Sequence, residues 1–518
     1  MLNNKFYKFG LILIFLIYVL LAFKDPFSER SLAPNLEPYP DSLYYSIPAW
    51  NWVNGDGFKM AYKGSEINFL VPPLYGLVLS PLFFLTKDFR FFYITNMILM
   101  IASIYLFIKI LEIIFTKEKF RNWYVLLGGF LLVTNFYFYN LPLNLMAENL
   151  TIFLMILGMY CLVKQKKIAV FGLFIVSVSL FLTKFSNVSL SVMFGLFYLY
   201  KIFKLRFNKF YYLGSSIFFG FLILLVLQNM NLINLAIPAT GIKAFSVDYF
   251  LNNLNFYLKT IVGGDTHYLW FNQSFFSRLV GISAVLGMVL GLISKRYRKV
   301  VLLLLSLVIA LVGFMSFFYY PDSRYILTLL PVLIFFCLFF INFIFKKSRI
   351  VGFIAIFVLV FYNLFVYKAN GTDVGLIVFK KQIGINLIYA EVPWNYKAVK
   401  HFEEVMGGAE NAYMATFLPP FYGGLVTKGK INFLPITKTQ EFSDVGKDLV
   451  SQIVGSSVEV KYKEVLNSGG RIFISDYYVS NNLEAWRKEY MDLISNFEVL
   501  KISEGCMGAC DVYELKLK

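Results

Sequence analysis

The segment Tyr39-Pro-Asp-Ser-Leu-Tyr-Tyr-Ser-Ile-Pro-Ala-Trp50 follows the first long apolar run of the chain. It places one acidic side chain, that of Asp41, close to a segment apolar enough to enter a membrane. Burying a carboxylate alone in hydrocarbon costs about 2.5–3.5 kcal/mol even on lenient insertion scales, so this group must be hydrated, paired or used in chemistry. The turns Asn54-Gly-Asp-Gly57 and Pro72-Pro-Leu-Tyr-Gly76 come soon after it. We expect the Asp41 carboxylate to be used in chemistry.

The composition predicts a polytopic α-helical membrane protein. Of the 518 residues, 58% are hydrophobic and only 15% are charged, and the apolar runs repeatedly approach the ~20 residues that cross a bilayer as a helix. A formal charge of +17 would suggest a nucleic-acid partner in a soluble protein. Here the Lys and Arg residues stand in short turns between apolar runs, where they report orientation instead. No nucleic acid is therefore expected as a partner.

The basic turns predict how the chain crosses the cell membrane. Lys5 and Lys8 precede the first apolar run, and the later basic turns are Lys117-Glu-Lys-Phe-Arg121, Lys164-Gln-Lys-Lys167, Lys201-Ile-Phe-Lys-Leu-Arg206, Lys295-Arg-Tyr-Arg-Lys299 and Lys346-Lys-Ser-Arg349. Placing all of them and the N-terminus in the cytoplasm satisfies the positive-inside rule. About eleven crossings result. They are the runs 9–23, 91–115, 123–139, 150–163, 168–183, 188–200, 210–227, 275–294, 300–318, 325–345 and 350–367.

One apolar segment, residues 67–85, does not fit as a crossing. If it spanned the membrane, the basic turn at Lys117 would fall outside and the alternation would break. We expect it to lie at the outer interface or to re-enter there, and the pair Pro72-Pro73 supports this because proline disturbs a helix interior. The alternative is an ordinary crossing with Lys87 and Arg90 as its cytoplasmic anchor.

The same alternation places the end of the chain outside the cell. Residues 1–367 are expected to form the transmembrane domain, and residues 368–518, where charges mix with shorter apolar runs, a soluble extracytoplasmic α/β domain. Residues 412–417 and 471–475 have the pattern of strands, while 482–497 have helix-type spacing with a strand after them. This domain has no Gly-rich phosphate loop in its sequence, so nucleotide binding is not expected.

The cysteines and histidines suggest one disulfide and no zinc site. Cys161 and Cys337 stand inside apolar runs, as core residues do. Cys506 and Cys510 are close in sequence, and in an oxidising exterior they could close a small disulfide loop. The chain has only two histidines, too few to predict zinc chemistry.

Ionisable residues at the ends of apolar runs form a set on the outer side. Asp41 lies in the first outer loop, Glu148 in the second, Lys184 in the third and Arg324 in the segment Tyr319-Tyr-Pro-Asp-Ser-Arg-Tyr325. A further outer loop adds Asp265 and His267. Because all stand on one side, they could converge on a single cavity, and an ionisable residue beside apolar helices is a functional hypothesis by default. The alternative is that each is a solvated loop residue.

On these residues the chain resembles the GT-C glycosyltransferases. The similarity rests on Pro40-Asp-Ser-Leu-Tyr-Tyr45, Gly55-Asp-Gly57, the Pro-Pro-Leu-Tyr sequence from Pro72, Met146-Ala-Glu148 and Ser323-Arg-Tyr-Ile-Leu-Thr-Leu-Leu-Pro331. It covers roughly residues 1–345, and it is strongest to the ArnT-like branch, which includes the dolichyl-phosphate-mannose protein mannosyltransferases. That family often has two adjacent acidic residues where Asp41 is followed by Ser42. Whether this loop takes part in metal binding is left open by that difference.

The resemblance implies transfer of a hexosyl or pentosyl group from a polyprenyl-phosphate-linked donor to a glycan, lipid or protein acceptor outside the cytoplasm. An acceptor hydroxyl needs a base within about 3 Å, a role worth roughly 10²–10⁴-fold, and we assign it to Asp41. The leaving phosphate suits the planar fork of a guanidinium, so Arg324 is the first candidate to bind it and Lys184 the second. Glu148 could hold Asp41, bind the acceptor or ligate a divalent cation.

Tyr44 and Tyr45, with Trp50, could stack on sugar rings, although such residues are also common at membrane interfaces. Two other classes of protein remain as alternatives. A transporter or lipid flippase should carry charges near the middle of its spans, around broken helices, whereas here the charges gather at the outer ends. A non-catalytic scaffold that displays its C-terminal domain would not explain the outer charges. The enzyme interpretation is therefore favoured.

Overall fold

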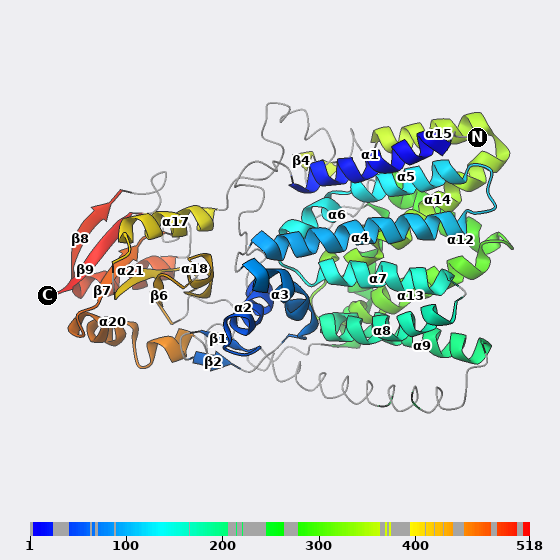
Figure 1. Cartoon of the computed structure of the whole chain (residues 1–518). Coiled ribbons are helices and arrows are strands. Elements are labelled where there is room, and N and C mark those ends of the chain that lie inside the picture. The colour runs from blue at the N-terminus through cyan, green and yellow to red at the C-terminus, as the bar shows by residue number, and fades with distance from the viewer. Residues whose placement is uncertain are drawn as a thin grey trace.

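The computed structural model describes most of the chain. Described are residues 4–23, 41–62, 65–67, 71–86, 90–164, 166–205, 214, 220, 245–263, 278–362, 368–369, 372–373, 394–409, 411–418, 420–427, 429–438, 450–477, 484–504 and 511–518. Within them, a bundle of apolar helices adjoins a smaller α/β domain at the C-terminal end (Figure 1).

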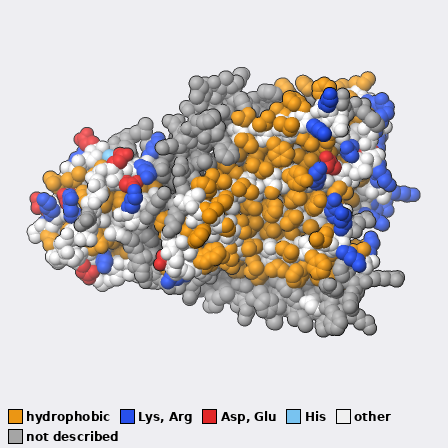
Figure 2. Space-filling model, viewed as in Figure 1, with side chains coloured by type: hydrophobic (Ala, Val, Ile, Leu, Met, Phe, Trp, Pro, Cys, Tyr) orange, Lys and Arg blue, Asp and Glu red, His pale blue; other side chains and the backbone are white. Residues whose placement is uncertain are grey.

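The bundle consists of helices, most of them apolar, several of which run side by side (Figure 1). They are α1 (Asn4–Phe23), α4 (Arg90–Ile114), α5 (Arg121–Val133), α7 (Glu148–Val163), α8 (Lys167–Thr183), α9 (Val188–Lys204), α11 (Phe250–Val262), α12 (Arg278–Ile293), α13 (Arg298–Ser316), α14 (Leu330–Lys347) and α15 (Arg349–Phe361). Among the described residues, five helices are long and apolar enough to cross a membrane, and shorter apolar helices accompany them. Figure 2 shows the apolar belt that this arrangement presents to its surroundings.

Local sequence decides where these helices start and stop. Pro331 stands in the first turn of α14, where its missing N–H costs nothing. Ser348 ends that helix, and its side chain caps α15 by accepting a hydrogen bond from the amide of Val351 at 3.4 Å. One residue thus serves as both the turn and the cap between two antiparallel helices.

The crossing predicted at 123–139 is broken near its end. Helix α5 stops at Val133 and a second helix, α6 (Phe136–Asn140), starts after Asn135. The Asn135 side chain accepts hydrogen bonds from the amides of Tyr137 and Phe138, at 3.1 and 3.3 Å, and this cap restarts the chain in a new helix. A short 3₁₀ turn, η1 (Leu141–Leu143), then leads to α7.

The segment 67–85 forms a short helix rather than a long crossing. After α2 (Asp41–Asn54), strands β1 (Met60–Tyr62) and β2 (Ser65–Ile67) form a hairpin, and α3 (Leu74–Thr86) begins directly after the Pro72-Pro73 pair. At 1.5 Å per residue, the 13 residues of α3 extend over only about 20 Å, short of the roughly 30 Å of a bilayer core. Figure 1 shows α2 and α3 between the bundle and the C-terminal sheet, as expected of an interfacial segment.

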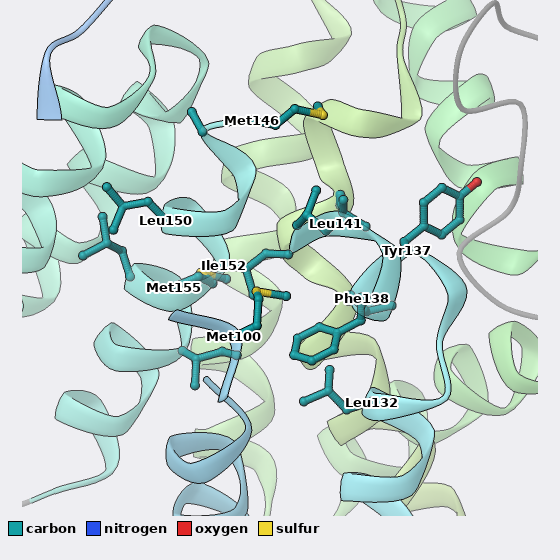
Figure 3. Packing of buried hydrophobic residues seen from close by; sticks show 14 of the residues in the cluster. Met100, Leu132, Tyr137, Phe138, Leu141, Met146, Leu150, Ile152 and Met155 are labelled. Atoms are coloured by element: carbon teal, nitrogen blue, oxygen red, sulfur yellow. The ribbon is translucent and has the colours of Figure 1, made fainter. Parts of the chain in front are cut away.

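Buried side chains join these elements into one core. Figure 3 shows part of it, where Met100 of α4, Leu132 of α5, Phe138 of α6 and Met155 of α7 come together. The most enclosed part of the bundle is the segment Ser323–Lys347, which is buried along almost its whole length. Cys337 lies in it and Cys161 lies in α7, and both are buried free thiols, as predicted.

The C-terminal domain is the predicted α/β unit. Its five-stranded sheet has the order β6-β5-β7-β9-β8, with β5 parallel to both of its neighbours and β9 antiparallel to both of its own. The strands are β5 (Ala412–Thr416), β6 (Asn432–Pro435), β7 (Arg471–Ser475), β8 (Phe497–Ser503) and β9 (Val512–Leu517), and the helices are α17 (Trp394–Met406), α18 (Pro420–Val426), α20 (Val458–Asn467) and α21 (Glu484–Ser495). The strands predicted at 412–417 and 471–475 are confirmed. The helix predicted at 482–497 is present as Glu484–Ser495, and the strand expected after it, β8, begins at Phe497. Helix α18 contacts α2, so the domain reaches the interfacial helices of the bundle.

The close crossing of α12 and α14 leads to a prediction about the stability of the protein. A Cβ at Gly287 of α12 would lie 1.7 Å from the backbone oxygen of Phe336 in α14, so Gly287→Ala must push two helices apart. Overpacking of this kind costs about 1–3 kcal/mol, and we expect a lower midpoint of unfolding in detergent. Gly313→Ala in α13 is the matched control, because nothing lies within 4 Å of its added Cβ. Equal midpoints for the two variants would contradict the close crossing.

Candidate functional site

Three of the predicted site residues meet at one end of the bundle. Glu148 is the first residue of α7, Lys184 follows the last residue of α8, and Arg324 lies in the 3₁₀ segment η5 (Ser323–Leu329) that leads into α14. Because α7 and α8 are antiparallel neighbours joined by a short turn, the start of one lies beside the end of the other. The segment η5 contacts α7 and completes the cluster.

The centre of this cluster is a buried ion pair. Lys184 Nζ donates a hydrogen bond to Glu148 Oε1 at 2.5 Å, and Arg324 Nε lies 4.0 Å from the same oxygen. The side chains of Glu148, Lys184 and Arg324 are only 5%, 17% and 16% exposed. A carboxylate so enclosed needs compensating charge, and removing one partner of such a pair costs about 3–5 kcal/mol.

A second carboxylate, Asp322, holds Arg324 from the other side. Asp322 Oδ1 accepts a hydrogen bond from the Arg324 amide at 2.8 Å, and Asp322 Oδ2 lies 3.3 Å from Arg324 Nε. Burial raises the pKa of the Asp322 carboxyl, while the neighbouring Arg324 charge opposes that rise. Asp322 was not among the site residues predicted from the sequence. The signal for it is an N-cap residue, Asp, directly before a helical turn that contains an arginine.

Both cations also lie against one aromatic ring. Lys184 Nζ is 5.2 Å and the Arg324 guanidinium carbon 5.5 Å from the centroid of the Tyr325 ring. Contacts of this kind contribute about 0.5–2 kcal/mol, more when water is excluded. Tyr325 in turn packs edge-on against Phe318, with ring centroids 5.6 Å apart. The ring keeps the two positive charges close together in spite of their mutual repulsion.

A chain of contacts joins α2 to the same end of α7. The Tyr45 ring of α2 packs edge-on against Tyr75 of α3 at 5.1 Å, and the Tyr75 hydroxyl donates to Asn96 Oδ1 at 2.8 Å. Asn96 Nδ2 donates to the carbonyl of Asn144 at 3.1 Å, and Asn149 Nδ2 donates to the same carbonyl at 3.0 Å. The residue next to Glu148 is thereby tied, through α4 and α3, to α2.

The remaining predicted site residues fall into two groups. Tyr45 is 6% exposed and Tyr44 is half-buried, so the Tyr45 ring serves packing in this structure. Asp41 is the first residue of α2, four positions before Tyr45, but its side chain lies outside the described residues. Asp265 and His267 lie outside the described residues as well. So does the pair predicted to form a disulfide, Cys506 and Cys510.

The described side chains do not fit a metal centre. Glu148, one of the two residues considered as ligands, faces two cationic groups, and a divalent cation would have to displace Lys184 to reach it. Within the described part of the chain, no group of three or more Asp, Glu, His or Cys residues could hold a metal ion. The cluster instead combines two cations with two carboxylates, an arrangement suited to receiving an anion.

Fold and site together define a polytopic membrane protein with an extramembrane α/β domain and a buried charged cluster at the end of the bundle that the domain adjoins. No protein-family model matches the sequence, and no curated protein matches it significantly. Two solved structures of ArnT from Cupriavidus metallidurans share the fold. The apo form is 10% identical with a TM-score of 0.61, and the form bound to undecaprenyl phosphate is 11% identical with a TM-score of 0.58.

Each of these matches covers 99% of this chain and 98% of the ArnT chain. A further similarity, to the Archaeoglobus fulgidus oligosaccharyltransferase tethered to an acceptor peptide, has 12% identity and a TM-score of 0.47, and covers 98% of this chain and 74% of that one. The resemblance to ArnT-like GT-C proteins is thus confirmed at the level of the fold. The predicted fold class, a polytopic helical membrane protein with a C-terminal α/β domain, is confirmed with it.

Proposed function

We propose that this protein is a membrane glycosyltransferase that moves a sugar from a polyprenyl-phosphate donor to an acceptor on the extracytoplasmic side. The observation that carries the proposal is the buried pair of cations, Lys184 and Arg324, in a fold shared with an ArnT structure that holds undecaprenyl phosphate. The acceptor is a glycan, a lipid or a protein. Membrane lipids surround the bundle.

The cations suit the leaving group of this reaction. As the bond between the anomeric carbon and the phosphate oxygen breaks, the electron pair stays with the lipid phosphate, and its negative charge increases. Preorganised positive charges in a water-poor site stabilise such a developing charge. Arg324 offers a planar fork for two phosphate oxygens, and Lys184 adds a point charge beside it. Glu148 holds Lys184 in place when no phosphate is present, and it lies 4.0 Å from Arg324 Nε.

The acceptor side of the reaction is assigned to α2. The acceptor hydroxyl oxygen forms the new bond to the anomeric carbon and loses its proton, which a carboxylate can accept. Asp41 is our choice for this base because α2 is tied to the start of α7 through Tyr45, Tyr75 and Asn96. Contact between α18 and α2 brings the C-terminal domain to the same place, where it could help to select the acceptor.

Orientation follows from the distribution of basic residues. Figure 2 shows Lys and Arg gathered at the end of the bundle farthest from the C-terminal domain. The positive-inside rule puts that end and the N-terminus in the cytoplasm, so the catalytic domain, residues 1–367, opens outward towards residues 368–518. A transporter or flippase is less well supported, because the Glu148 cluster lies at helix ends instead of at the middle of the spans.

The orientation is tested with reporter fusions. An enzyme reporter that works only outside the cytoplasm should be active when fused after Lys368 and inactive when fused at Lys166, because an odd number of crossings separates the two points. A reporter that works only inside should give the opposite result, which serves as the control. If the two reporters exchanged their patterns, the proposed outward-facing site would be wrong.

The base is tested by Asp41→Asn. This substitution keeps the shape but removes the proton acceptor, so transfer should fall by at least ~10²-fold while the protein still inserts and folds. Mass spectrometry of cell-envelope glycans and glycoproteins, with and without the protein, identifies the product to be assayed. Asp56→Asn, an exposed aspartate in the turn after α2, is the matched control and should behave as wild type. Near-normal turnover in Asp41→Asn would remove Asp41 from the site.

The donor phosphate is tested at Arg324. Arg324→Lys keeps the charge and loses the fork, so the KM for the lipid donor should rise several-fold, and Arg324→Ala should raise it by about tenfold or more. The KM for the acceptor should change little in both variants. Arg298→Lys is the control. Arg298 is exposed, and its Nε donates a hydrogen bond to the Leu292 carbonyl, away from the Glu148 cluster. Unchanged donor KM in Arg324→Ala would overturn the proposed function.

A further inference from the structure

Asp322 lies between helix α13 and the 3₁₀ segment η5. It follows α13 after a short turn and is the N-cap residue of η5, in an extended conformation with φ −134° and ψ 129°. Its side chain is 9% exposed. Both of its carboxylate oxygens are directed to the same residue, Arg324, one to the amide and one to the guanidinium. An ordinary N-cap needs only the first of these contacts.

We propose that Asp322 is a positioning residue for the lipid-donor site: it fixes the guanidinium of Arg324 for the donor phosphate. The inference rests on the proposed function and adds a residue to it. Asp322 itself need not touch the donor, since it acts through Arg324.

The distances show a division of labour between the two carboxylates. Glu148 Oε1 is 2.5 Å from Lys184 Nζ but 4.0 Å from Arg324 Nε, so Glu148 mainly holds the lysine. Asp322 Oδ2 is 3.3 Å from Arg324 Nε, so Asp322 mainly holds the arginine. Each cation thus has its own carboxylate. When a phosphate arrives and competes with Glu148, Arg324 would still be anchored.

The geometry of arginine explains why such an anchor matters. A guanidinium donates from Nε and from its two terminal nitrogens in one plane. The Asp322 contact to Nε is an ion pair at 3.3 Å and not a hydrogen bond, so it attracts the Nε end of the guanidinium by charge. A backbone contact at the Arg324 amide fixes the start of the same side chain. Pre-ordering a long side chain in this way lowers the ordering cost of binding, which would appear as tighter donor binding.

The surroundings limit what else could perform this role. Arg324 and Tyr325 face Asp322 from η5, Lys184 from the end of α8, Glu148 from the start of α7 and Tyr257 from α11. The carboxylate among them, Glu148, lies farther from Arg324 Nε than Asp322 does and is already bonded to Lys184. Loss of the Asp322 charge therefore removes the carboxylate that lies nearest to Arg324 Nε among the ion pairs of the described residues.

The test compares charge removal at Asp322 with charge removal nearby. Asp322→Asn keeps an oxygen that can accept from the Arg324 amide, so η5 should fold, but the charged contact to the guanidinium is lost. We expect the donor KM to rise by about tenfold, with kcat and the acceptor KM within about twofold of wild type. Asp248→Asn is the matched control, because Asp248 is exposed at a neighbouring helix end and bonds to Ser246.

A double-mutant cycle separates positioning from general damage. If Asp322 acts through Arg324, Asp322→Asn should add little to the donor KM of Arg324→Lys, because coupled residues are not additive. Thermal shifts with farnesyl phosphate as the probe give a readout without turnover, and they should shrink in Asp322→Asn but not in Asp248→Asn. If Asp322→Asn does not fold, Asp322→Ser, which keeps an N-cap acceptor, replaces it.

The possible outcomes are distinct. A raised donor KM with a smaller probe shift and a non-additive cycle supports the inference. In a second outcome, the Arg324 variants have a raised donor KM but Asp322→Asn has the same donor KM as Asp248→Asn. This result would overturn the positioning role and leave the proposed function standing. Additive effects of Asp322→Asn and Arg324→Lys would overturn it too. Unimpaired Arg324→Ala would overturn the proposed function and this inference together.

Discussion

The buried carboxylate of Glu148 is the constraint around which the end of the bundle next to the C-terminal domain is organised. An enclosed charge is tolerable only with partners, and here the partners come from other elements: Lys184 at the end of α8 and Arg324 in η5. The pairing therefore fixes the relative position of three parts of the bundle. Tyr325 adds a shared aromatic surface for both cations. The two cations that neutralise this carboxylate are the ones to which we assign the donor phosphate.

The other end of α7 is held by a different device. Lys201 Nζ donates to the carbonyls of Cys161, Leu162 and Lys164, at 2.9, 2.8 and 2.8 Å, and so satisfies acceptors that the end of a helix leaves unpaired. Nearby, Glu118 is paired with Arg296 and Lys346, at 2.6 and 3.2 Å. The bundle thus has neutralised carboxylates at both ends and an apolar middle. Such a distribution is compatible with the proposed reaction at one end of the bundle.

The small helices α2 and α3, at the end of the bundle next to the C-terminal domain, connect the bundle and this domain to the site. Helix α2 is linked to the start of α7 by the Tyr45, Tyr75 and Asn96 contacts, and α18 of the C-terminal domain contacts α2. An acceptor bound by the soluble domain would thus meet the membrane domain near α2. The proposed division, with the donor phosphate on α7, α8 and η5 and the acceptor on α2, assigns each substrate to a separate group of elements.

The sequence by itself determined the membrane class, the α/β nature of the C-terminal domain and several of its elements. These depend on hydropathy and periodicity, which are local properties of the chain. It also indicated Glu148, Lys184 and Arg324, because an ionisable residue at the end of an apolar run stands out. The break at Asn135 was missed, since one capping side chain outweighed a continuous apolar pattern.

Only the tertiary structure decided which charges pair. Lys184 and Glu148 are 36 residues apart and Arg324 is far from both, so no sequence spacing states that they share one oxygen. Asp322 became a candidate positioning residue because its Oδ2 lies 3.3 Å from Arg324 Nε. Tyr45 was identified as a packing residue because its ring packs against Tyr75. Pairing depends on distances and burial between elements far apart in the chain. Those quantities exist only once the helices have packed.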